Sequence, residues 1–137
     1  MRRFIVTMVA VTGLVFLLAA SAMAADPTVD SVLAIEYDNG VFAAAVLAHG
    51  PAPLAFAQLF VNDGTGEVEV IPDKEAHIVL LPAKNLTLFK FTVLGPEPVI
   101  KPGYSVRAEV TDINNHTAEK LVGCVQGRLF RQLVVCY

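Results

Sequence analysis

The sequence predicts an all-β domain, an antiparallel β-sandwich of seven to nine strands. Short apolar runs are separated by Gly, Pro, Asn and Asp, at the spacing of about 8–12 residues that is typical of sandwiches and barrels. No window shows the period of a long amphipathic helix. The segment from Tyr104 to Thr111 alternates apolar and polar side chains throughout, and this period of two is that of a strand and not of a helix.

Nine segments are expected to form the strands, and most of the turns between them contain Asn-Gly, Asp-Gly or Pro. The expected core combines alternate residues of three strands: Leu33, Ile35, Phe89, Phe91, Tyr104, Val106, Ala108 and Val110. The expected strands are Asp30 to Tyr37, Val41 to Ala48, Ala55 to Val61, Glu67 to Ile71, His77 to Leu81, Leu86 to Leu94, Tyr104 to Thr111, Ala118 to Gln126 and Leu129 to Tyr137.

The first 24 residues are predicted to be a cleavable signal peptide. Arg2 and Arg3 provide a positive start, an uncharged apolar stretch follows, and Ala22-Met23-Ala24 has the pattern of a signal-peptidase site. Cleavage after Ala24 leaves one domain, residues 25–137, in a secreted or periplasmic protein. The alternative is an uncleaved anchor, because the apolar stretch is just long enough to cross a bilayer.

The charge of the chain limits its partners. Removal of residues 1–24 takes away two of the 10 basic residues and none of the 13 acidic ones, so the net charge of the mature chain is −5. A mild acidic excess without a basic run argues against nucleic-acid binding. It also gives no electrostatic reason to bind a membrane after the signal has been removed. We therefore expect a protein partner or self-association.

One segment carries a resemblance to a known fold. Residues 102–112 read Pro-Gly-Tyr-Ser-Val-Arg-Ala-Glu-Val-Thr-Asp, and residues 114–118 read Asn-Asn-His-Thr-Ala. This segment resembles the penultimate strand, loop and last strand of bacterial immunoglobulin-like and fibronectin type III-like domains. The resemblance, which covers residues 102–118 only, implies an immunoglobulin-like sandwich with Tyr104 packed as in a tyrosine corner. The chain departs from that pattern because it lacks tryptophan and an early cysteine.

The two cysteines, Cys124 and Cys136, are predicted to form a disulfide. An exported domain enters an oxidising compartment, and two cysteines make one pair. A hairpin centred near Phe130 would place them opposite each other, at a Cβ separation of about 4.5–5.5 Å, which is close to what a disulfide accepts. Two buried free thiols are the alternative.

No motif in the sequence points to catalysis, and no cofactor is expected. Serine occurs in no G-x-S-x-G elbow, and no base is placed beside a nucleophile. The candidate metal ligands are His49 and His77. If successive strands reverse regularly, these two histidines lie at one end of the sandwich and His116 lies at the other. The loop at 62–67 is rich in side-chain oxygens, but Asx turns explain its composition without calcium.

The predicted function is that of a non-catalytic module for protein binding or for surface or envelope assembly. The segment Val41 to Ala48 has no polar face, so an uncovered side of this strand would be an interaction surface. We take Val41, Ala44 and Val46 as the interface candidates. Tight internal packing of the small alanines is the alternative for this strand. The alternative function is that of an exported protein that binds a small ligand, a carbohydrate or a metal.

Overall fold

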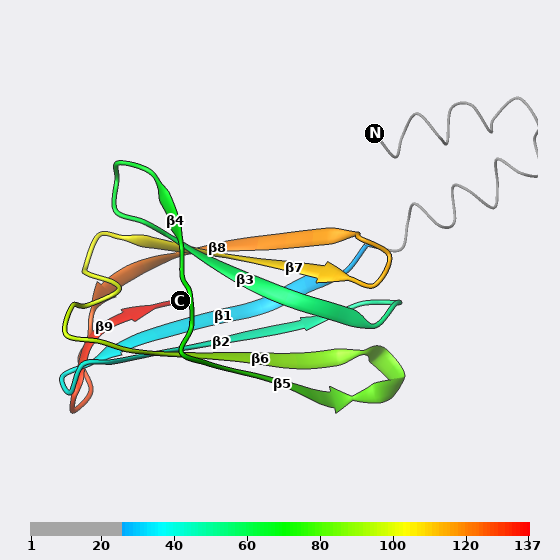
Figure 1. Cartoon of the computed structure of the whole chain (residues 1–137), viewed down its shortest axis with the longest axis horizontal. Helices are drawn as coiled ribbons and strands as arrows, with labels where there is room; N and C mark the ends of the chain where they lie inside the picture. The colour runs from blue at the N-terminus through cyan, green and yellow to red at the C-terminus, as the bar shows by residue number, and fades with distance from the viewer. Residues whose placement is uncertain (1–25) are drawn as a thin grey trace, which may run out of the picture.

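The computed structural model describes residues 26–137 and is all-β (Figure 1). The predicted signal peptide, residues 1–24, lies outside the described residues. Within residues 26–137 the structure has nine antiparallel strands, no α-helix and the single-turn 3₁₀ helix η2 (Pro82–Lys84). The strands are β1 (Thr28–Tyr37), β2 (Val41–His49), β3 (Leu54–Asn62), β4 (Glu67–Glu69), β5 (Lys74–Leu81), β6 (Leu86–Leu94), β7 (Ser105–Asp112), β8 (Thr117–Gln126) and β9 (Gln132–Cys136).

The strands form one continuous sheet in the order β4-β3-β7-β8-β9-β1-β2-β6-β5. The sheet folds over at β8 and β9, so that two layers face each other across a shared core (Figure 1). We call β9-β1-β2-β6-β5 layer A and β4-β3-β7-β8 layer B. Strand β1 lies against β7 and β8, and β3 lies against β6. This arrangement confirms the predicted all-β, two-layer architecture.

The predicted turns form where Asn, Asp and Gly occur. In the β1–β2 turn, the Asn39 side chain accepts the Val41 N–H at 3.2 Å, and Gly40 has a φ of +83°. In the β3–β4 turn, Asn62 Oδ1 accepts the Gly64 N–H at 2.8 Å, and Asp63 Oδ1 accepts the Thr65 N–H at 2.9 Å. These side chains replace backbone partners in the turn, which is why the chain reverses at these points.

The chain passes from one layer to the other between β4 and β5. Antiparallel pairing fixes the direction of every strand, and it requires β4 and β5 to run the same way. Regular reversal of successive strands therefore fails at this point. Because β4 and β5 form the two ends of the strand order, each leaves one side of its backbone without a neighbouring strand in the described part of the chain.

The core contains most of the predicted residues. Phe89, Phe91, Val106, Ala108 and Val110 are buried, and Tyr104 is partly buried against them. The prediction for β1 was wrong, because Leu33 is 42% exposed and Ile35 is only half-buried. The residues of β1 that face inward are Val32, Ala34 and Glu36.

The inward face of β1 includes a carboxylate. Glu36 is only 2% exposed, and its Oε1 accepts the backbone N–H groups of Val99 and Ile100 at 2.6 and 3.3 Å. Desolvation raises the pKa of this carboxyl, although the two N–H donors act in the opposite direction. Glu36 thus fastens the β6–β7 connection to layer A. Both faces of β1 carry apolar residues, so the alternation alone did not identify the inner one.

The predicted disulfide is present. Cys124 of β8 and Cys136 of β9 are directly paired in the ladder, and their sulfur atoms are bonded. Both cysteines are buried in the core. The disulfide therefore closes the hairpin at the point where layer B continues into layer A.

Candidate functional site

The outer face of layer A is the main apolar surface of the described residues. The buried residues of β2 face the core, so the residues that alternate with them, and the ladder partners of those residues on β1 and β6, point outward. The apolar side chains at these positions are Leu33, Ile35, Val41, Ala43, Ala45, Leu47, Ala76, Ile78, Leu81, Leu86, Leu88, Leu94 and Val135. Lys74 and Lys90 introduce charge among the outward positions of β5 and β6, and Asp30 contacts His49 where β1 and β2 meet at one end of this face.

Strand β5 forms the free edge of this surface. All eight residues of β5 are exposed, and the strand pairs only with β6. Lys74 and Glu75 begin the strand and Pro82 follows it, but the four residues 78–81 between them are apolar. Natural sheet edges are usually protected by charge or proline along the strand, because an apolar edge can pair with another chain. Half of β5 has no such protection.

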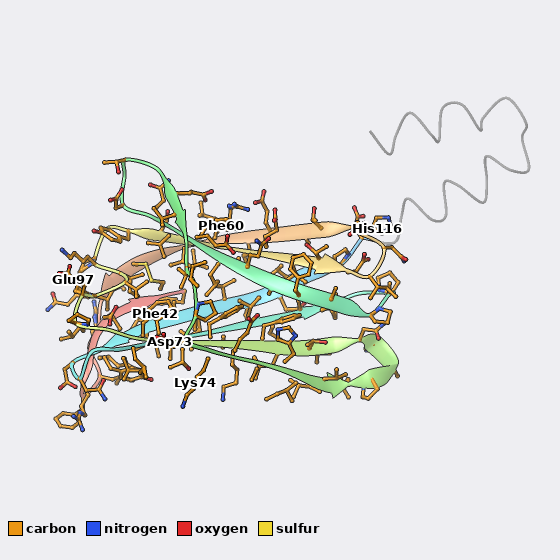
Figure 2. The ribbon with its side chains drawn as sticks, viewed as in Figure 1. Phe42, Phe60, Asp73, Lys74, Glu97 and His116 are labelled. Atoms are coloured by element: carbon orange, nitrogen blue, oxygen red, sulfur yellow. A yellow bond between two sulfur atoms is a disulfide. The ribbon has the colours of Figure 1, made fainter. Side chains whose placement is uncertain are left out.

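The outer face of layer B is polar by contrast. Arg107 lies at its centre, with Nε 2.9 Å from Glu67 and Nη1 2.8 Å from Glu119, and its guanidinium stacks 4.3 Å from the ring of Phe60. These carboxylates raise the pKa of Arg107, and its hydrogen bonds lower the pKa of Glu67. In Figure 2, Phe60 lies at the top on layer B, and Lys74 lies at the bottom on layer A.

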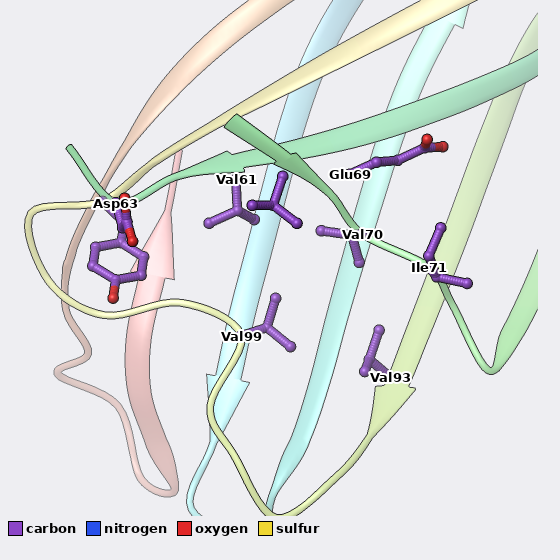
Figure 3. Close-up of a pocket in the computed structure, with 9 residues that line it drawn as sticks. Val61, Asp63, Glu69, Val70, Ile71, Val93 and Val99 are labelled. Atoms are coloured by element: carbon purple, nitrogen blue, oxygen red, sulfur yellow. The ribbon is translucent and has the colours of Figure 1, made fainter. Parts of the chain in front are cut away.

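An apolar pocket of about 260 Å³ opens where β4 crosses towards layer A (Figure 3). Val61, Val93, Val99 and Tyr104 are among its lining residues, and Asp63 lies at one end. The Asp63 carboxylate is occupied by the turn, since Oδ1 also accepts the Thr65 hydroxyl at 2.6 Å. These hydrogen bonds lower the pKa of Asp63. The pocket therefore offers apolar contact rather than acid–base chemistry.

The three residues proposed for an interface lie on two different faces. Val41 is half-buried on the outer face of layer A. Ala44 and Val46 are buried and point into the core. The interface prediction was therefore wrong for these two residues. On β2 the neighbouring residues Ala45 and Leu47 point outward instead.

The histidines proposed as metal ligands do not come together. His49 ends β2 on the outer face and contacts Asp30 at 2.8 Å, whereas His77 pairs with the inward residue Phe89 and contacts Glu75 at 3.0 Å. His116 lies 3.9 Å from Asp26, so it shares the end of the molecule with His49. The predicted separation of these two was wrong because β4 and β5 run the same way. Residues 26–137 contain no group of three or more His, Cys, Asp and Glu side chains placed to hold a metal ion.

Several features could not be found from the sequence. Glu36 is the buried carboxylate of the core, and Asp112 is a second one, whose Oδ1 accepts the N–H groups of Asn114 and His116 at 2.8 and 2.9 Å. Charged residues are mostly exposed in folded proteins, and the strand that contains Glu36 does not show that a distant loop will supply its two N–H donors. The one available signal was the Asp-x-Asn pattern of an Asx turn at 112–114.

Comparison of the chain with family models, with curated proteins and with solved structures gave no match. Among residues 26–137 there is no helix of sufficient length and hydrophobicity to cross a bilayer.

Proposed function

We propose that this chain is an exported, non-catalytic protein-binding module that uses the outer face of layer A and its edge strand β5. The observation that carries the proposal is the apolar character of this face together with the exposure of all eight residues of β5. A partner that adds a strand to β5 satisfies the free backbone groups of the edge. It also removes apolar area from water, at about 25 cal/mol per Å².

We also propose that the domain is immunoglobulin-like, as the resemblance of residues 102–118 implies. The strand order supports this. The run β1-β2-β6-β5 matches the ABED sheet of immunoglobulin domains, and β4-β3-β7-β8 matches the opposite sheet, C′CFG. Strand β9 has no counterpart in either set and closes the sandwich between β8 and β1. Immunoglobulin-like sandwiches serve many functions, so the binding proposal depends on the surface and not on the fold.

The test introduces a charge into each outer face. Leu88→Glu changes the centre of the layer A surface, and Leu121→Glu is the matched control on layer B, where Leu121 is exposed and pairs with Arg107. Sedimentation velocity of the exported protein measures self-association, and a photo-crosslinking residue at position 45 identifies a partner in the native envelope. We expect Leu88→Glu to abolish the complex and Leu121→Glu to leave it intact.

Denaturant unfolding of both variants provides the folding control. A photo-crosslinking residue at position 121 gives the background for crosslinking from layer B. The proposal is contradicted if the wild-type protein is monomeric and position 45 gives no crosslinked product above that background. A complex that survives Leu88→Glu in a folded variant also contradicts it.

A second function, binding of a small apolar ligand, is favoured by the pocket beneath β4. Its volume of about 260 Å³ and its valine lining suit a compact uncharged molecule. The neutral probe N-phenyl-1-naphthylamine should gain fluorescence with the wild-type protein and not with Val99→Trp, which fills the pocket. Equal fluorescence with both proteins excludes this site.

A further inference from the structure

The turn between β8 and β9 projects apolar side chains that make little contact with the rest of the domain. We call residues 127–131, Gly-Arg-Leu-Phe-Arg, the hairpin tip. Phe130 is 90% exposed, which makes it the most exposed large apolar residue of the described chain, and Leu129 is 70% exposed. Arg128 and Arg131 flank this pair and are themselves exposed. An apolar pair between two cations is unlike either outer face of the sandwich.

The tip is held in a defined conformation. The Gly127 N–H donates to Leu133 O at 2.8 Å, the Gln132 N–H donates to Leu129 O at 3.2 Å, and the disulfide closes the strands beneath. Gly127 also lies so close to the backbone of Gln132 that a Cβ at this position would clash with it. The exposed pair is therefore presented by a constrained hairpin, and little conformational entropy is lost when it binds.

Arg131 adds to this constraint at a conformational cost. Its φ of +69° lies in the left-handed region, where glycine is unstrained and other residues are not. The guanidinium Nε donates to Asp38 Oδ1 at 3.2 Å, and the Arg131 carbonyl accepts the Asp38 N–H at 2.9 Å. Arg128 forms no ion pair within residues 26–137. With Asp38 counted, the tip keeps one net positive charge.

We propose that the hairpin tip is a membrane-surface anchor: Leu129 and Phe130 enter the interface of an anionic bilayer while Arg128 contacts lipid phosphate. An aromatic side chain beside arginine is the composition that favours the boundary between headgroups and acyl chains. The anchor is independent of the protein-binding surface on layer A, since different residues form the two.

The size and shape of the tip favour lipid over a protein partner. A stable protein interface buries about 800 Å² on each side, which five residues of a protruding turn do not supply. A bilayer interface deforms around a small protrusion. Its many phosphate groups can bind Arg128 without a carboxylate at a fixed position. We expected no membrane binding because the net charge of the mature chain is negative. Net charge is a sum over the whole chain, and it does not describe the local charge of this turn.

The test uses the absence of tryptophan from the chain. Phe130→Trp places the only tryptophan at the tip. Phe56→Trp is the matched control near the start of β3, and β3 starts at the end of the sandwich opposite the β8–β9 turn (Figure 1). Each variant is recovered as its host exports it and is titrated with phosphatidylcholine vesicles, with and without phosphatidylglycerol. Both variants share the same N-terminus, so any effect of residues 1–24 is common to them.

We expect the emission of Phe130→Trp to shift to shorter wavelength on anionic vesicles and the emission of Phe56→Trp to remain unchanged. Adding Arg128→Ala to Phe130→Trp should raise the lipid concentration at half-maximal shift about fivefold, since one cation near an anionic surface contributes about that factor. Leu88→Glu, which tests the protein-binding surface, should leave vesicle binding unchanged.

Three results overturn the proposal. The first is the absence of a shift for Phe130→Trp on anionic vesicles, or an equal shift for Phe56→Trp. The second is equal binding to neutral and anionic vesicles with no effect of Arg128→Ala. The third is an emission shift of Phe130→Trp that occurs when lipid-free envelope protein is added and does not occur with vesicles. That result would make the tip a protein-binding element.

Discussion

The two outer faces of this sandwich differ in composition: the outer face of layer B is polar, and the outer face of layer A is apolar. On layer B, Arg107 of β7 lies between Glu67 and Glu119 and stacks on Phe60, so charged residues from three strands neutralise one another. On layer A, β2 contributes Val41, Ala43, Ala45 and Leu47, and the strands beside it contribute more apolar residues. Layer B has the alternation of a strand with one solvated face, whereas layer A is apolar on both faces.

This difference supports the proposal that layer A is the binding face, because both layers already bury an apolar inner face. Burial of the inner residues accounts for folding, and the outer residues of layer B satisfy one another in water. The outer apolar residues of layer A are not buried by folding and have no polar partners in water. We therefore expect them to contribute free energy only when the protein associates with a partner. If this interpretation is right, charge on the outer face of layer A disturbs binding and not folding.

The largest expected effect separates the two faces of β2. Val46→Glu buries a carboxylate without a partner in the core, whereas Ala45→Glu leaves it at the surface. We expect Val46→Glu to lower the free energy of unfolding by at least about 4 kcal/mol, because an uncompensated buried charge is among the most destabilising changes. Ala45→Glu should change it by about 0.5 kcal/mol or less. Urea denaturation checks both, and similar losses for the two variants would mean that β2 has no solvent-facing side.

The next effect concerns the corner where the two layers join. Replacing Cys124 and Cys136 together by alanine opens a loop with a sequence separation of 12 residues. The loss should be about 3 kcal/mol in the chain-entropy model. Thermal unfolding with and without reductant measures it: wild-type protein under reducing conditions should match the double variant. A wild-type protein that titrates as two free thiols after unfolding would contradict the disulfide.

A smaller effect is predicted for the carboxylate that fastens the β6–β7 connection to layer A. The pKa of Glu36 is raised by burial, so the protonated form is favoured in the folded state. Its contribution to stability is fully present below the ordinary pKa of a glutamate, about 4.3, and is lost as the pH rises through the folded value. Glu36→Gln keeps an acceptor for Val99 and removes the charge, so it should be as stable as wild type at low pH and more stable at pH 7. Chemical denaturation across this range checks the sign, and a variant that is less stable at pH 7 refutes it.

The smallest effect belongs to the outer face of layer B. Arg107→Ala removes the cation from among Glu67, Glu109 and Glu119, which then repel one another. We expect a modest decrease in Tm that diminishes in high salt, since exposed charges are screened. Arg107→Lys should recover part of the decrease. If the decrease in Tm does not change with salt, Arg107 stabilises the protein through its packing on Phe60 and not through its charge.

The sequence by itself determined the strands, their turns and the disulfide, because these depend on neighbours close in the chain. The alternation of β7 fixes its buried face, and Asn39, Asn62 and Asp63 complete their turns with their own side chains. Cys124 and Cys136 meet because a short hairpin leaves little choice of register.

Only the tertiary structure decided what depends on distant segments. Strand β1 is apolar on both faces, and its orientation follows from the loop that supplies two N–H groups to Glu36. Strand β2 is ambiguous for the same reason, so Ala44 and Val46 were assigned to the wrong face. The direction of β5 depends on a crossover between layers, and its exposure depends on the absence of a further strand in the described part of the chain. An alternating pattern shows that a strand has two faces, but when both are apolar, only packing against other strands determines which one meets water.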